Sequence, residues 1–147
     1  MPVIGVRMDK IEAERKENIK IEGQMRILPV PRILQVQEVQ VPGPTGKLNI
    51  VEVSFEYVTS YDPPVGEMKV SGTIMFQEAE PIRKQLVDAW KEKRQLNPEI
   101  GREIIYRMTQ QAFLVMMNLA RELGLPSPIQ PRIQTEGEEI RGDVSAS

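Results

Sequence analysis

Apolar and polar residues alternate along two segments in the first half of the chain, LNIVEVSFEYV (48–58) and EMKVSGTIMF (67–76). Strict alternation predicts strands with one buried face and one solvated face. The connection between them, TSYDPPVG (59–66), is rich in turn-forming residues, and its two prolines cannot donate to a strand ladder. We therefore expect two long antiparallel strands joined by this loop. The predicted core positions are Val51, Val53, Phe55 and Tyr57 in the first strand and Met68, Val70, Ile74 and Phe76 in the second.

Weaker alternation and high β-propensity mark three segments further upstream, at 3–16, 18–28 and 32–41. Two proline pairs, in LPVPR (28–32) and VPGPTG (41–46), are expected to interrupt them. The sequence therefore predicts an antiparallel sheet of four or five strands, covered on one side and solvated on the other.

The second half of the chain has the periodicity of two helices. In EPIRKQLVDAWKEKRQ (80–95), apolar residues recur every three or four positions, from Ile82 to Trp90. A second helix is expected to begin at Pro98, with Asn97 as its N-cap, and to end before Gly124. The fold class is therefore predicted as α+β, with the sheet followed by two helices. Residues 1–133 are expected to form a single domain, and the acidic tail 134–147 is expected to be disordered.

The second helix carries more apolar residues than one sheet face can cover. Its main stripe would satisfy a sheet, but a second ridge lies about 200° to 260° around the helix, counted at 100° per residue from Ile100. Either this ridge packs on the preceding helix, or it meets another subunit or a client peptide. The methionines of the helix either fill gaps in its own core or form an adaptable binding surface. The predicted interface residues are Tyr106, Phe113, Met117 and Ala120.

Two proline-rich segments are further candidate contacts. The loop could present Tyr61, Pro63, Pro64 and Val65 to a partner, or it could serve only as a turn. The segment LPSPIQPRI (125–133) could be a docking peptide, or it could pack on its own subunit through its apolar residues.

Composition excludes several kinds of chemistry. The 147 residues include no Cys and no His, which removes disulfides, thiolate nucleophiles, the usual general base and the commonest transition-metal ligand. The four Asp residues are far apart in the sequence. We therefore expect a protein that is not an enzyme and that has no cofactor and no metal site.

Charge and hydropathy limit the partners and the location. The net charge is −2, and without the tail the count is 18 basic against 17 acidic residues, so direct nucleic-acid binding is not favoured. No apolar run reaches the roughly 18 residues of a membrane span, and the N-terminus lacks the pattern of a signal peptide. The expected location is cytoplasmic, with no membrane contact.

The run FEYVTSYDPPVGEMKVSG (55–72) and the later GLPSPI (124–129) resemble a family of small archaeal SecB-like proteins. This resemblance implies a homo-oligomer built through sheets and long helices, with grooves that hold unfolded or extended polypeptide. The leading hypothesis is therefore a non-enzymatic, chaperone-like binding protein. The alternative is an accessory subunit of a large assembly such as the ribosome.

Overall fold

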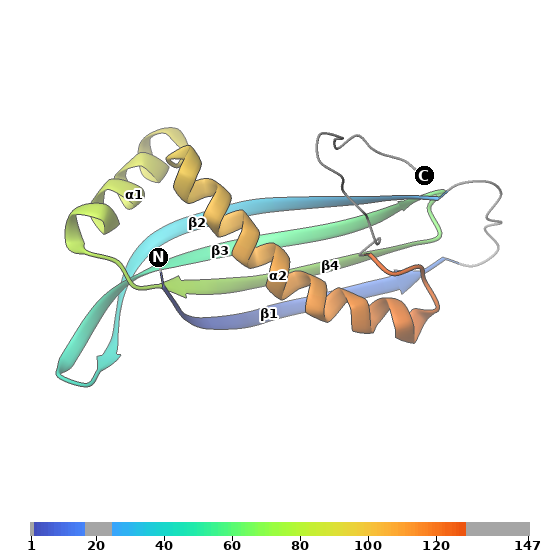
Figure 1. The fold of residues 1–147 in the computed structure, drawn as a ribbon, viewed down its shortest axis with the longest axis horizontal. Helices are drawn as coiled ribbons and strands as arrows, with labels where there is room; N and C mark the ends of the chain where they lie inside the picture. The colour runs from blue at the N-terminus through green and yellow to red at the C-terminus, as the bar shows by residue number, and fades with distance from the viewer. Residues whose placement is uncertain (1, 17–24, 129–147) are drawn as a thin grey trace, which may run out of the picture.

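The computed structural model describes residues 2–16 and 25–128, which form a four-stranded antiparallel sheet followed by two helices (Figure 1). The strand order is β1-β4-β3-β2, so β1 and β2 are the edges. The predicted α+β class is confirmed, with four strands in the described part of the chain. Most of the predicted segment 18–28 and the tail 134–147 lie outside the described residues. The elements are β1 Val3–Arg15, β2 Arg26–Gly43, β3 Gly46–Asp62, β4 Gly66–Phe76, α1 Glu80–Lys93 and α2 Pro98–Leu123.

The alternating strands bury the face that the sequence predicts. All eight predicted core side chains of β3 and β4 are buried, and the face continues through the buried Thr59 and Tyr61. Both helices add side chains to the same hydrophobic cluster, including Leu86 and Trp90 of α1. The sheet and the helices therefore share one core, on one side of the sheet.

The other side of the sheet is lined by charged and polar groups. Glu56 accepts a hydrogen bond from Arg32 of the neighbouring β2 and forms a second ion pair with Lys69 of β4. On the edge strand β1, the hydrogen bond from Arg7 to Asp9 holds the pKa of Asp9 below its usual value. This face is the solvated one, as the alternation predicts.

The proline pair in LPVPR does not interrupt the sheet, so that prediction is wrong. β2 continues through Pro29 and Pro31, which lie opposite Thr59 and Tyr57 of β3. Residues two apart in a strand direct their backbone nitrogens to the same side. Because β2 is an edge strand, two prolines whose nitrogens face outward remove no hydrogen bond to β3.

Both predicted loops are turns, but each is shorter than the sequence pattern suggests. β2 and β3 pair up to Gly43 and Gly46, and β3 and β4 are separated by only three residues, 63–65. The β2–β3 hairpin also outruns the rest of the sheet, since the pairing of β3 with β4 starts at Val51 (Figure 1). We call this two-stranded extension, residues 39–50, the arm.

The ends of α2 follow the local signals in the sequence. The side chain of Asn97 accepts a hydrogen bond from the Glu99 amide, and Pro98 is the first helical residue. At the other end Gly124 adopts a left-handed conformation with φ 67°, and the Leu125 amide donates to the Ala120 carbonyl. The predicted length and both predicted boundaries of this helix are confirmed.

Candidate functional site: the outer face of helix α2

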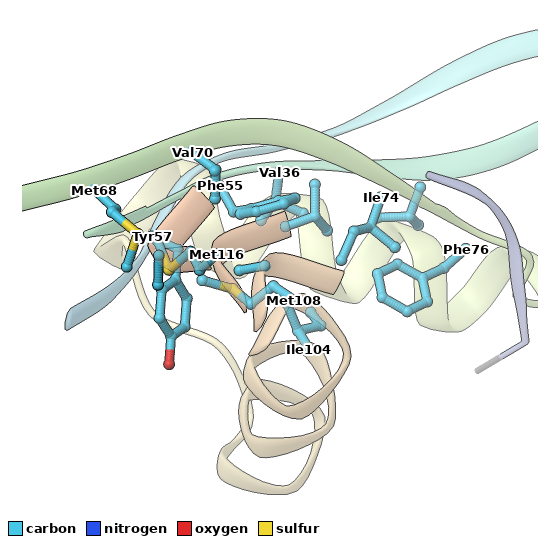
Figure 2. Packing of buried hydrophobic residues seen from close by; sticks show 14 of the residues in the cluster. Val36, Phe55, Tyr57, Met68, Val70, Ile74, Phe76, Ile104, Met108 and Met116 are labelled. Carbon is cyan, nitrogen blue, oxygen red and sulfur yellow. The ribbon is translucent and has the colours of Figure 1, made fainter. Parts of the chain in front are cut away.

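Helix α2 meets the sheet along a single ridge of residues spaced four apart. It runs diagonally across the sheet and contacts all four strands (Figure 1). Figure 2 shows three of these side chains from α2, Ile104, Met108 and Met116, gathered with the core residues of the strands. Spacing of four advances about 40° around a helix at each step, so the contact line winds around α2 as the helix crosses the strands. The buried residues are Ile104, Met108, Ala112, Met116 and Ala120.

The first helix does not cover α2. Helix α1 packs on β2 and β3, where Arg83 pairs with Glu38 and the indole of Trp90 donates to Gln35. No Cα atom of α1 lies within 8 Å of one in α2, and both helices are fully described. The two exposed residues of the second ridge, Tyr106 and Met117, are therefore not covered by the preceding helix.

The side of α2 that faces away from the sheet exposes three large apolar side chains. Tyr106 is 60% exposed, Leu114 is 62% exposed and Met117 is 45% exposed. Gln110 lies among them and donates a hydrogen bond of 3.2 Å to the Tyr106 hydroxyl. These four residues follow one another at four-, four- and three-residue spacing, so they form one strip along three turns. We call this strip the outer face of α2.

Two of the four predicted interface residues lie elsewhere than on this strip. Phe113 is half-buried, because its ring meets the ring of Tyr57 on β3 edge to face. Ala120 is 2% exposed and belongs to the buried ridge. Leu114, which the sequence pattern leaves among polar neighbours, takes their place. Its signal was present in the sequence as an isolated apolar residue on the polar side of the helix.

The methionines of α2 divide between the two roles considered for them. Met108 and Met116 are fully buried and fill the space between the helix and the sheet. The sulfur of Met116 accepts a hydrogen bond of 2.9 Å from the buried Thr59 hydroxyl. Met117 alone of the helix methionines is exposed, so only this flexible side chain is available to a partner.

The loop between β3 and β4 is not the apolar contact that the sequence suggests. Tyr61 and Val65 are 3% and 5% exposed, since both side chains turn into the core of their own chain. Pro63 is half-buried, and Pro64 is the exposed member of the four. This loop therefore acts mainly as a turn, and the tyrosine at its start has a structural partner, the Pro126 carbonyl.

The chemistry available at the outer face of α2 is that of apolar contact. Burial raises the pKa of Tyr57 beneath it, and a hydrogen bond with Thr109 acts in the opposite direction. In residues 2–16 and 25–128, no three His, Cys, Asp or Glu side chains are grouped so that they could hold a metal ion. No helix among the same residues has the length and apolar character needed to cross a membrane.

No protein-family model matches the chain, and no curated protein matches it. Among solved structures, the chain is similar to a SecB-like chaperone of Mycobacterium tuberculosis in complex with a ChAD peptide from the HigA1 antitoxin. The two chains are 13% identical, with a TM-score of 0.46, over 93% of this chain and 92% of the other.

Proposed function

We propose that the protein is a non-enzymatic binding protein of the chaperone type, which holds extended polypeptide and assembles with copies of itself. The observation that carries the proposal is the outer face of α2, which residues 2–16 and 25–128 leave uncovered. Exposed strips of large apolar residues mark interaction sites in proteins, since they otherwise promote aggregation.

The composition of the outer face suits contact with another polypeptide. Tyrosine and methionine are enriched at protein interfaces, and a strip along one side of a helix fits a groove or a second helix. Gln110 places a polar group within the strip, and its bond to Tyr106 holds the aromatic ring along the helix surface. The arrangement supports a partner that is itself apolar along its length, such as an unfolded chain or a second α2.

A second feature supports binding of extended chains. The outer edge of β2 lacks two amide donors, at Pro29 and Pro31, whereas β1 contains no proline from Val3 to Arg15. An added strand needs free donors and acceptors along the edge that it joins. The β1 edge is therefore the one that suits strand addition, by a client or by a second copy.

The proposal is tested by following the aggregation of an unfolded model protein. The wild-type chain is expected to slow aggregation at a stoichiometric ratio, and a variant carrying Leu114→Glu and Met117→Glu is expected to lose most of that effect. Gln85→Glu, an exposed substitution on α1, is the matched control for added charge. No effect of the wild-type chain at several-fold excess would contradict the chaperone function.

Light scattering on the same proteins tests the assembly. We expect the wild-type chain to have the mass of a multimer and the double variant to have a smaller mass, with an unchanged helical circular dichroism signal. A wild-type monomer would contradict the homo-oligomer. Recovery of the protein from lysate only with ribosomes or another large particle would favour the alternative, an accessory subunit.

A further inference from the structure

The chain that leaves α2 lies on the sheet as an extended segment. Its residues are Leu125, Pro126, Ser127 and Pro128, and we call them the exit segment. The two ends, Leu125 and Pro128, are buried, while Pro126 and Ser127 between them are exposed. Burial of residues three apart is the pattern of a polyproline-type helix, which has three residues per turn.

Leu125 of the exit segment packs tightly against the backbone at Gly66. A Cβ atom added to Gly66 would lie 2.8 Å and 3.0 Å from the two terminal methyl carbons of Leu125, so the leucine occupies space that only a glycine leaves free. The Glu14 carbonyl oxygen would lie 2.8 Å from the same atom, so the backbone of β1 closes the site beside the leucine. Val65, the preceding residue, is part of the hydrophobic cluster that also contains Leu125.

One polar contact in this site is a hydrogen bond from a side chain to the backbone of the exit segment. The hydroxyl of Tyr61, a side chain only 3% exposed, donates a hydrogen bond of 2.6 Å to the Pro126 carbonyl oxygen. Any residue at that position would supply the same acceptor. The two prolines have no N–H, so they bring no donor that this site would have to satisfy. These contacts call for a branched aliphatic side chain, a carbonyl at the next residue and a proline three positions after the first, and Ser127 between the two prolines also makes an interaction of its own.

The end of α2 is held by β1 as well as by the exit segment, whose Leu125 amide donates to the Ala120 carbonyl. One guanidinium nitrogen of Arg15, Nη1, donates to the carbonyl oxygens of Leu123 and Gly124, at 2.9 Å and 2.8 Å. These bonds join the last turn of the helix to the end of β1. The two Arg15 bonds end at Leu123 and Gly124, so departure of the exit segment breaks the Leu125 cap and leaves these two bonds in place.

We propose that the exit segment is an internal ligand, which occupies a site for Leu-Pro-Ser-Pro segments of other polypeptides and yields it to them. The inference builds on the proposed function, since it assigns one class of client and one site for it. A segment attached to the same chain has a high effective concentration, so it keeps the site occupied until a client is abundant or binds elsewhere as well. Vacating the site exposes Tyr61 and the bare backbone at Gly66.

The first test uses the full chain with a single spin label. The protein has no cysteine, so Pro126→Cys, which keeps the carbonyl that Tyr61 binds, gives one attachment point on an exposed residue of the exit segment. An excess of a synthetic peptide GLPSPIQ is expected to convert the label spectrum from restricted to mobile. The peptide GDPSPIQ, with aspartate in place of the leucine, is the control and should leave the spectrum unchanged. A spectrum that neither peptide alters, or that both alter equally, would overturn the proposal.

The second test measures peptide affinity by fluorescence anisotropy. In the full chain, Leu125→Ser empties the leucine site and is expected to raise the affinity for labelled GLPSPIQ at least tenfold over the wild-type chain. Adding Tyr61→Phe should remove most of that gain, whereas Leu34→Ser, at an exposed leucine of β2, should leave the wild-type affinity unchanged. Equal affinity of the wild-type chain and a folded Leu125→Ser variant would overturn the proposal. If that variant fails to fold, the spin-label experiment alone tests whether the peptide displaces the exit segment.

The two proposals fail separately. Aggregation slowed by the wild-type chain without binding of GLPSPIQ would remove the internal ligand and leave the proposed function. Binding of GLPSPIQ without any effect on aggregation would retain this site as a peptide-binding site and remove the chaperone function.

Discussion

The rings of Phe113 and Tyr57 meet edge to face, with centroids 5.7 Å apart and planes at 81°. This pair joins α2 to β3 at the border between the buried ridge of the helix and its outer face. Aromatic pairs in this geometry stabilise a fold beyond the area that they bury. Phe113 therefore belongs to the fold, and its neighbour Leu114 belongs to the surface.

Substitutions at these two neighbours should separate stability from binding. Phe113→Ala is expected to lower the free energy of unfolding by about 2 kcal/mol, since a half-buried ring loses less than a fully buried one. Leu114→Ala should change it by no more than about 0.5 kcal/mol. Urea unfolding followed by circular dichroism measures both. Measured at a protein concentration where the chain is monomeric, similar losses for the two variants would show that Leu114 is covered by its own chain.

Because Thr59 donates a hydrogen bond to the Met116 sulfur, removing the donor should cost less stability than removing the acceptor. A thioether is a weak acceptor, so Thr59→Val should leave the stability within about 1 kcal/mol of the wild type. Met116→Leu leaves a buried hydroxyl without a partner and should cost about 1–3 kcal/mol. The double variant should be more stable than Met116→Leu alone. Thermal unfolding of the wild type, the two single variants and the double variant gives the double-mutant cycle. If the stability loss of the double variant equalled the sum of the two single losses, Thr59 and Met116 would not be coupled.

The prolines of β2 are expected to protect its edge from pairing with other chains. Replacing Pro29 and Pro31 with threonine restores two outward N–H groups and should increase self-association of the folded protein. Pro64→Thr, at an exposed turn position, is the control. Sedimentation velocity over a concentration series measures the change. Identical profiles for all three proteins would show that this edge is protected by something other than its prolines.

The two buried tyrosines should make the protein less stable in alkaline solution. Burial raises the pKa of Tyr57 and of Tyr61 above the ordinary value of 10.0. The unfolded chain therefore releases these protons at lower pH than the folded chain, and the stability falls as the pH rises above about 10. Urea midpoints at pH 8 and pH 10.5 should differ less for Tyr61→Phe than for the wild type. Tyr106→Phe, which changes an exposed tyrosine, should show the wild-type difference.

Local patterns in the sequence were sufficient to predict most of the strands and helices. Alternation identified β3 and β4 and the side of each that is buried, because a strand has a period of two whatever its neighbours are. Asn97 and Gly124 marked both ends of α2, because capping depends on residues within one turn of the end. The described part of the fold differs from expectation mainly where neighbours in space decide the outcome.

The features that the sequence did not reveal depend on tertiary position. Proline is compatible with an edge strand and not with a central one, so the pair at Pro29 and Pro31 could be interpreted only once the strand order was known. A helical projection treats the contact line of α2 as straight, whereas the diagonal crossing buries Ala120. Burial of Tyr61 likewise follows from the path of the chain after α2, which no local pattern specifies.

The arm is less stable than the four-stranded part of the sheet. Each of its strands has only one hydrogen-bonded neighbour, and the hairpin turn at its tip is exposed. A two-stranded ribbon is marginally stable by itself, so its bonds open without any change in the four-stranded part. The hairpin can thus unzip from its tip toward Val51, and its amide hydrogens should exchange with solvent deuterium long before those of β4 and of the part of β3 that pairs with β4.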